Sequence, residues 1–303
     1  MRGNGTLVMV KRFLSGRRTA LFIGSALLVA VALVAVVTQN ASRPGRPAAR
    51  ASAPSASASP VPATATRLHF ATLPPGSPLP SGAQCAREVR ADKSQEIRPA
   101  NAVFNRTVGQ HVGPGLFPSG DSPQAGLLAP LISGDFTGTT EQILEWAACK
   151  WGINQDIVFA QAAAESSWQQ DYFSDWTSDS ATCAPGHGLG ADGKSGQCPQ
   201  SYGILQTKYF LWKTAWPGIA HSTAMNVDVA YAIWRSCFDG YEVWLSNSAP
   251  AGQPYHAGDV WGCLGRWYAG NWYSPAADQY INRVQTLLKE QVWEQPGFIQ
   301  AAG

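Results

Sequence analysis

The stretch that decides the fold is "DIVFAQAAAESSW", residues 156–168. Asn154 stands just ahead of it as a helix N-cap residue, and its apolar residues recur at helical spacing. Val158, Ala162 and Glu165 fall on one stripe (i, i+4, i+7), so a carboxylate shares a face with residues that are typical of a buried core. The stretch therefore predicts a helix that carries Glu165 close to its C-terminal end.

The position of Glu165 predicts a raised pKa. A carboxylate near a helix C-terminus faces the negative end of the helix dipole, and apolar neighbours disfavour its charged form. Both effects raise the pKa, and a carboxylic acid that is still protonated near neutral pH is suited to general-acid catalysis. An ion pair with Arg or Lys is the structural alternative, and the remaining motifs bear on the choice.

Helical signals continue on both sides of this stretch. Thr139 and Gln142 predict a capping box at the start of a helix, and Gly152 predicts where that helix ends. Two later helices are expected, one capped by Asn226 and the last begun by Ser274–Pro275. Strand signals are few and short, and they are confined to the region between Asp171 and Gln206. The pattern indicates a mainly α domain.

Four motifs follow one another along the chain: Glu-Ser-Ser at 165–167, Ser-x-Gly-x-x-Gln at 201–206, an aromatic loop with glycine at 267–273, and Tyr-Ile-x-x-Val at 280–284. In this order they resemble the soluble lytic transglycosylases and goose-type lysozymes, over about residues 138–295. The third motif departs from the family's usual Tyr-Asn-x-Gly, because this chain has "WYAGN". The resemblance implies a mainly α (α+β lysozyme-like) fold, in which a helical catalytic domain carries short strands or loops beside a cleft for amino sugars.

The resemblance also implies roles for single residues. Glu165 matches the catalytic acid that protonates the oxygen bridging N-acetylmuramic acid and N-acetylglucosamine in peptidoglycan. In the lytic transglycosylases this one Glu then acts as the base on the sugar's 6-hydroxyl and leaves a 1,6-anhydro end. No cofactor and no metal are implied. The implied substrate-binding residues are Ser201, Gly203, Gln206, Tyr268 and Tyr280, the last as the hydrogen-bond partner of the catalytic carboxylate.

Hydrolysis is the first alternative. In the hydrolytic muramidases additional Asp residues position a water, and Asp175 and Asp179 are the candidates here. Their structural alternative is a turn-forming role in a solvated loop. Two non-enzymatic alternatives are a cell-wall-binding module that keeps the lysozyme-like scaffold without catalysis, and a scaffold protein of an envelope machine.

The N-terminal part of the chain predicts export. Residues 1–18 carry five Lys or Arg and no acid, and residues 19–37 carry no charge. Nineteen apolar or small residues are just enough to cross a bilayer as a helix, and the basic flank predicts a cytoplasmic N-terminus. A retained transmembrane anchor is favoured, and a cleaved signal peptide, which would give a secreted protein, is the alternative. Residues 38–68, rich in Ala, Ser and Pro, predict a disordered linker.

The exported part has its own organisation and charge. Residues 69–137, rich in Gly and Pro, predict an N-terminal extension that wraps the core, with a poorly ordered stalk as the alternative, and residues 138–303 form the catalytic domain. Residues 68–303 carry 13 Lys and Arg against all 20 Asp and Glu. Nucleic acid is therefore not expected as a partner, because a polyanion binder needs the opposite sign. The expected partners are peptidoglycan glycan strands, and the membrane through the N-terminal helix.

Aromatic and cysteine residues complete the sequence evidence. All 12 Trp fall between Trp146 and Trp293, and flat rings can stack on sugar faces or pack in a core. Six cysteines in an exported domain indicate disulfides, for which fifteen pairings are open. A zinc site at Cys183, His187 and Cys198 is the alternative, but it lacks a fourth ligand. The stacking candidates are Trp168, Trp267, Trp272 and Tyr273. Nearest-neighbour pairing is favoured, which gives Cys85–Cys149, Cys183–Cys198 and Cys237–Cys263.

Overall fold

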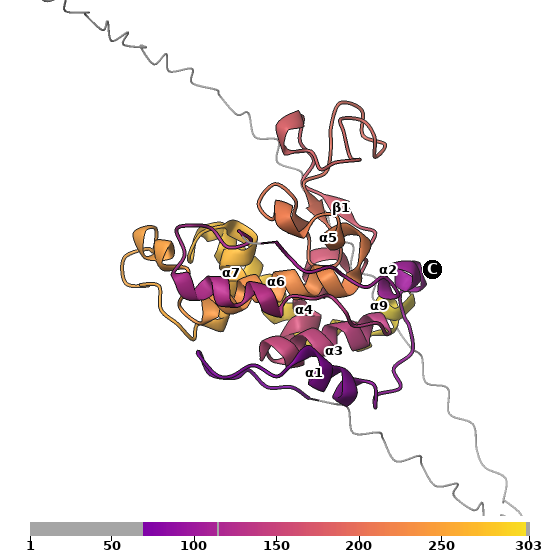
Figure 1. Cartoon of the computed structure of the whole chain (residues 1–303), viewed down its shortest axis with the longest axis horizontal. Helices are drawn as coiled ribbons and strands as arrows, with labels where there is room; N and C mark the ends of the chain where they lie inside the picture. Colours follow the sequence, from indigo (N-terminus) through magenta and orange to yellow (C-terminus); the bar gives the residue numbers. More distant parts are fainter. Residues whose placement is uncertain (1–68, 114, 301–303) are drawn as a thin grey trace, which may run out of the picture. The chain divides into compact units, whose positions relative to one another are not determined.

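A computed structural model describes residues 69–113 and 115–300, drawn in colour in Figure 1. The expected basic segment, anchor and linker, residues 1–68, lie outside the described residues. Within the described ranges, no helix combines the length and the apolar character needed to cross a bilayer. Helices dominate this part of the chain, as the sequence predicts, and three short strands form one small sheet.

Helix α3 (Thr140–Trp151) begins and ends where its sequence signals predict. The Thr139 hydroxyl accepts a hydrogen bond from the Gln142 backbone N–H, and the Gln142 side chain accepts one from the Thr139 N–H at 3.0 Å. Gly152 adopts the left-handed conformation (φ 57°) that ends the helix. These are local polar signals, so they can be read from the sequence without knowledge of the tertiary structure.

Helix α4 (Gln155–Ser166) carries Glu165 in its last turn. Asn154 Oδ1 accepts from the Ile157 N–H at 3.1 Å, which confirms the predicted cap. The helix is buried along most of its length, and it packs against α3 and α8. It stops at Ser167, which is left-handed (φ 54°), one residue after the last turn that carries Glu165.

Helix α6 (Thr223–Phe238) is buried throughout. The prediction that Asn226 caps it is wrong, because the helix begins one turn earlier and Ser222 Oγ accepts from the Met225 N–H at 3.2 Å. Asn226 is fully buried inside the helix. Its side chain instead links α6 to the turn after β2 and to α5, since it accepts from the N–H of Leu205 and donates to the carbonyls of Tyr202 and Ile219.

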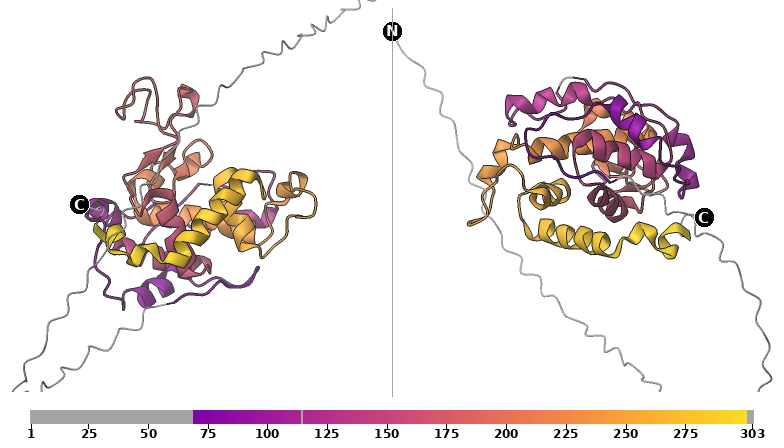
Figure 2. Two further views of the ribbon diagram at one scale, coloured as in Figure 1. Left: turned by 180° about the vertical axis from the view of Figure 1, so that it is seen from behind. Right: turned by 90° about the horizontal axis from the view of Figure 1, so that it is seen from below.

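Helices α7 (Val260–Ala269) and α8 (Pro275–Glu290) pack against each other. The predicted aromatic loop at 267–273 is helical in its first three residues, which complete α7, and Gly270 (φ 69°) ends that helix. Ser274 caps α8 as predicted. Figure 2 shows α8, in yellow, lying across the other helices, and its packing partners are α4 and α7.

Shorter helices fill the rest of the structure. The segment before α3 carries α1, which packs on α3 and is joined to it by the Cys85–Cys149 disulfide. The remaining α-helices are α1 (Gly82–Val89), α2 (Ala102–Asn105), α5 (Gly218–His221) and α9 (Pro296–Gln300). The 3-10 turns are Pro99–Asn101, Pro123–Leu127, Ala129–Leu131, Ser180–Thr182, Lys213–Ala215, Val243–Asn247 and Val292–Glu294.

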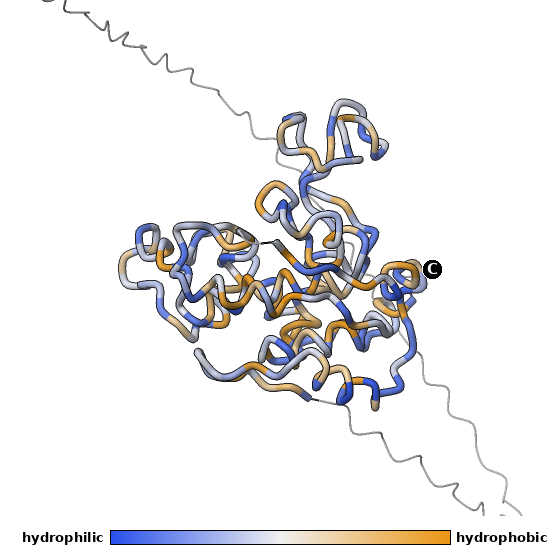
Figure 3. The backbone as a smooth tube through the Cα atoms, in the orientation of Figure 1, coloured by the Kyte–Doolittle hydropathy of each residue, from blue (hydrophilic) through white to orange (hydrophobic). Residues whose placement is uncertain are grey.

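The sheet follows α4 in the sequence and consists of β1 (Phe173–Ser174), β2 (Ser201–Tyr202) and β3 (Thr207–Lys208). The strands are antiparallel and lie in the order β1-β2-β3. Ser174 pairs with Ser201, and Ser201 with Lys208. Between β1 and β2 the chain makes an excursion, residues 175–200, which we call the disulfide lobe. Figure 1 shows this lobe at the top, projecting from the helices, and Figure 3 shows that it lacks the hydrophobic stretches of the central helices.

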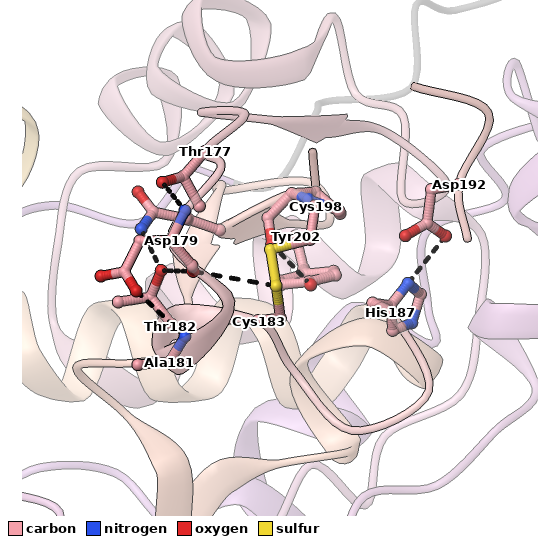
Figure 4. Close-up of a disulfide and its surroundings, with 11 residues drawn as sticks. Thr177, Asp179, Ala181, Thr182, Cys183, His187, Asp192, Cys198 and Tyr202 are labelled. Atoms are coloured by element: carbon pink, nitrogen blue, oxygen red, sulfur yellow. Dashed lines mark hydrogen bonds and ion pairs between the residues drawn. A yellow bond between two sulfur atoms is a disulfide. The ribbon is translucent and has the colours of Figure 1, made fainter. Parts of the chain in front are cut away.

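The three disulfides are those that nearest-neighbour pairing predicts. Figure 4 shows the Cys183–Cys198 bond, which closes the disulfide lobe, with His187 turned toward Asp192 instead of toward the sulfurs. Because both cysteine sulfurs are bonded to each other, the alternative of a zinc site at this place is wrong. Among the residues with described positions, no other group of His, Cys, Asp and Glu could hold a metal ion.

Candidate active site

Glu165 lies on the last turn of α4 and lines a cavity of about 420 Å³. The Tyr280 hydroxyl, on α8, donates a hydrogen bond to Glu165 Oε1 at 2.5 Å. The structure therefore brings together the two residues that the resemblance pairs, although 115 positions separate them in the sequence.

The pKa of Glu165 is raised to about 7, chiefly by burial and to a smaller extent by the negative charge of Asp175. Hydrogen bonds from Tyr280 and Trp267 and the positive charge of Arg283 act in the opposite direction, because they stabilise the carboxylate. Burial outweighs them. Near neutral pH a large fraction of the Glu165 side chains keeps a proton, which is the state that a general acid needs.

Tyr280 is held as a donor to Glu165. Burial and the neighbouring Glu165 charge raise the pKa of its hydroxyl well above the ordinary value, so the hydroxyl keeps its proton. Gln161, one helical turn before Glu165, also hydrogen-bonds Tyr280. The ring of Tyr268 stacks on the ring of Tyr280 with centroids 4.6 Å apart, and Tyr268 presents its outer side to the cavity.

Asp175, at the start of the disulfide lobe, lines the same cavity and has the opposite character. Its Oδ2 accepts from the Ser201 hydroxyl at 2.7 Å and contacts Lys208 Nζ at 2.9 Å. Burial raises the pKa of Asp175, but the hydrogen bonds from Lys208 and Ser201 and the Lys208 charge outweigh burial and bring the pKa below its usual range. The cavity thus holds one carboxyl group that keeps its proton up to a pH of about 7 and one that is ionised at that pH, a pairing typical of acid–base sites.

The predicted turn at 201–206 reaches the cavity through only some of its residues. Gln206, left-handed at φ 52°, lines the cavity, and its Nε2 donates to the carbonyls of Tyr172 and Gly203 at 3.0 and 2.7 Å. Its Oε1 accepts from the Ser174 hydroxyl. Gly203 lies behind this surface at φ 78°, where a Cβ would come within 2.4 Å of Asn226. The glycine therefore serves the turn, and its contact to substrate finds no support in its position.

Asp179 lies apart from Glu165, within the disulfide lobe. Its Oδ1 accepts from the Ala181 N–H at 3.0 Å and caps the short helical turn that begins at Ser180, as Figure 4 shows. It does not line the Glu165 cavity. Of the two aspartates expected to position water, only Asp175 is in place to do so.

The stacking candidates divide between groove and core. Trp267 lines the Glu165 cavity. Trp168 and Trp272 are each only 1% exposed and belong to the core, and the Tyr273 hydroxyl is bonded to Asp259 outside the cavity. All four residues lie in or next to the motifs, so the sequence could not show which of them line the cavity and which are buried in the core.

Several lining residues were missed by the sequence reasoning. Arg283 follows Tyr280 by three residues on the same helix, a spacing that puts both on one face and could have indicated it. Lys208 is placed by the sheet register, since it pairs with Ser201 across β2 and β3. Tyr172 and Ser174 carry no comparable signal in the sequence.

The Glu165 cavity continues into a second cavity of about 350 Å³. The residues that line both are Gln206, Lys208, Trp267, Tyr268 and Ala269. The second cavity adds a largely aromatic and apolar wall from Phe210, Leu211, Trp212 and Trp244. We call the two cavities together the groove; it extends beyond the Glu165–Tyr280 pair and has room for an extended ligand.

Comparisons with protein-family models, with curated proteins and with solved structures found no match to this chain. The case for a function therefore depends on the motifs of the sequence and on the geometry of the groove.

Proposed function

We propose that this chain is a glycosidase that cleaves the β-1,4 bond between N-acetylmuramic acid and N-acetylglucosamine in peptidoglycan, with Glu165 as its general acid. The observation that carries the proposal is the Glu165–Tyr280 pair in the groove, where burial raises the pKa of Glu165 to about 7. A protonated carboxyl in an open groove lined by aromatic rings is what glycosidic cleavage asks of a protein.

The first candidate reaction is that of a lytic transglycosylase. The proton of Glu165 passes to the bridging oxygen, the bond to the anomeric carbon breaks, and the sugar's own acetamido group stabilises the resulting cation. The Glu165 carboxylate then takes the proton of the 6-hydroxyl, whose oxygen closes the 1,6-anhydro ring. Glu165 regains its proton and no water is consumed. Tyr280 stabilises the carboxylate between these two steps, because its hydroxyl donates to Oε1.

Hydrolysis is the second candidate, and the position of Asp175 favours it. Asp175 lines the same cavity as Glu165 and is ionised beside Lys208, so it can orient a water toward the anomeric carbon. The same contacts lower its pKa and make it a weak base, which is the argument for the first candidate.

The three disulfides indicate an oxidising, extracytoplasmic compartment. We place the groove there, with residues 19–37 as a membrane anchor or, if they are cleaved, as a secretion signal. Glycan strands are the proposed partner.

The test is incubation of the purified chain with peptidoglycan, followed by mass spectrometry of the soluble products. Released muropeptides with anhydro ends, one water lighter than reducing ends, support transglycosylation, and reducing ends support hydrolysis. A chain that binds the polymer and releases nothing is a wall-binding module, and the enzyme proposal is then wrong.

A further inference from the structure

The second cavity of the groove contains a buried arginine. Arg266 lies on α7 and lines this cavity, although its side chain is only 10% exposed. Its Nε contacts Glu242 Oε2 at 2.5 Å, and the Glu242 side chain is 1% exposed. The guanidinium also lies 5.5 Å from the centre of the Trp244 ring. Arg266 is thus held in place from behind by a carboxylate and from the side by an aromatic ring.

The N–H groups of the two terminal nitrogens of Arg266 are available to donate hydrogen bonds. Over residues 69–113 and 115–300, neither Nη1 nor Nη2 has a hydrogen-bond partner, and neither is among the fully buried unpaired nitrogens. Because Arg266 lines the cavity, these two nitrogens are the ones that can bind a ligand there. A guanidinium with two such nitrogens binds a carboxylate through two parallel hydrogen bonds, and its rigid fork makes the geometry specific.

The charges around Arg266 leave its cation incompletely compensated. Burial raises the pKa of Glu242 to about 7, and the Arg266 charge only partly opposes this, so Glu242 is incompletely ionised at neutral pH. Asp121, the other acid nearby, accepts from Trp244 Nε1 at 2.9 Å, and burial raises its pKa as well. Lys208, the other cation of this cavity, is already paired with Asp175.

We propose that the Arg266 cavity is a subsite for a carboxylate-bearing substituent of the glycan strand. This inference rests on the proposed function, because the shared lining residues make the cavity a continuation of the Glu165 cavity. N-acetylmuramic acid carries a lactyl group, which presents its own carboxylate in peptide-free strands and otherwise bears a peptide with further carboxylates. N-acetylglucosamine carries no carboxylate. The exposed Leu211 and the neighbouring Phe210 offer apolar contact to the remainder of such a substituent.

The experiment measures dissociation constants of the full chain carrying Glu165→Gln, which cannot cut its ligands. Three soluble oligomers of equal length are compared: peptide-bearing glycan, the same glycan after removal of its peptides, and an N-acetylglucosamine oligomer. We expect the two carboxylate-bearing ligands to bind more tightly. Adding Arg266→Gln with Glu242→Gln removes both charges together, so that neither partner is left as an unpaired buried charge. It should weaken binding of at least one carboxylate-bearing ligand about 10-fold or more, and change binding of the N-acetylglucosamine oligomer by less than about 2-fold.

The arms of the experiment separate the outcomes. A loss confined to peptide-bearing glycan identifies the peptide as the source of the carboxylate, and a loss on peptide-free glycan identifies the lactyl group. Equal losses on all three ligands, or no loss on any, overturn the inference. Arg87→Gln, an exposed arginine of α1, is the matched control and should change nothing. If the double variant does not fold, Arg266→Lys decides, since it keeps the charge and loses the fork: a several-fold loss on carboxylate ligands supports the subsite, and unchanged affinity overturns it.

Failure of the proposed function gives a different result. A wild-type chain that releases no muropeptides, while the Arg266-dependent preference persists, contradicts the enzyme and leaves the binding site standing. An active enzyme without that preference contradicts the subsite alone.

Discussion

At the scale of single residues, the groove contains two carboxyl groups whose pKa values are shifted in opposite directions, one by burial and the other by pairing with a cation. Among the residues whose positions are described, no cation forms an ion pair with Glu165, and desolvation dominates its titration. Asp175 has Lys208 at 2.9 Å and a hydroxyl donor, and these dominate instead. The same type of side chain thus has a raised pKa in one place and a lowered pKa in the other.

Glu165→Gln preserves the shape of the side chain and removes its proton. We expect muropeptide release to fall by roughly 10²–10⁴-fold or more, because general-acid catalysis contributes about that factor. Asp171→Asn, an exposed carboxylate outside the groove, is the matched control. Near-normal turnover by Glu165→Gln, with both variants folded as judged by circular dichroism, would remove Glu165 from the mechanism.

The pH dependence of activity should follow the titration of Glu165. Since the acid must be protonated, kcat/KM should decline as the pH rises through about 7. Tyr280→Phe removes a hydrogen bond that lowers the pKa of Glu165, so the alkaline limb should move to higher pH. Asp175→Asn removes a negative charge that raises it, so the limb should move to lower pH. Shifts of both variants in one direction would contradict this assignment.

At the scale of elements, the C-terminal end of α4 is fixed by the segment before α3. The buried Arg98 donates from Nε to the Ser167 carbonyl and from Nη2 to the Phe298 carbonyl, both at 2.8 Å. Asn101 donates to the Trp168 carbonyl at 2.7 Å. Ser167 and Trp168 are both left-handed, so these contacts hold an unfavourable backbone conformation directly after Glu165.

Arg98→Ala should lower the free energy of unfolding by about 2–4 kcal/mol, because it removes the charge-assisted hydrogen bonds and the packing of a buried side chain. It should also lower kcat, since Glu165 loses its fixed position. Chemical denaturation and steady-state kinetics on soluble glycan measure the two effects. Arg106→Ala, at an exposed arginine of the same segment, is the control. Equal stability of the two variants would show that Arg98 does not support α4.

The elements also show which parts of the fold the sequence contains. Thr139 and Asn154 cap their helices through their own backbone neighbours, so a short window was enough to predict them. Asn226 has a typical capping side chain, yet it hydrogen-bonds three backbone groups of other segments. The helix is capped by Ser222 instead. The sequence predicts a loop from residue 267 onward, but α7 continues through Ala269 and ends at Gly270. Tertiary partners decided the case of Asn226, whereas α7 ends at Gly270 through a local left-handed cap.

At the scale of the whole molecule, Cys85–Cys149 joins the N-terminal segment to the helical core. The bonded residues are 64 positions apart, and a loop of that size corresponds to about 4 kcal/mol in the chain-entropy description. Cys85→Ser with Cys149→Ser should lower the urea-unfolding free energy by up to about that amount. The same change at Cys183 and Cys198, 15 positions apart, should cost about 3 kcal/mol. The reverse order of effects would contradict the role given to the long-range bond.

The groove was only partly accessible from the sequence. Glu165, Gln206, Tyr268 and Tyr280 could be selected because they lie in motifs, and they do line one cavity. Arg266 and its partner Glu242 could not, because 24 positions separate them and a buried arginine looks like any other in a sequence. Asp175 and Asp179 looked equivalent, and only the packing of the disulfide lobe distinguishes them.

The central claim is that the groove holds the Glu165 carboxyl protonated near neutral pH. Carbon-13 NMR titration of the glutamate side chains, with Glu165→Gln to assign the resonance, measures this directly. We predict a midpoint about 7 for Glu165, and a midpoint near the ordinary glutamate value of about 4.3 would contradict the account.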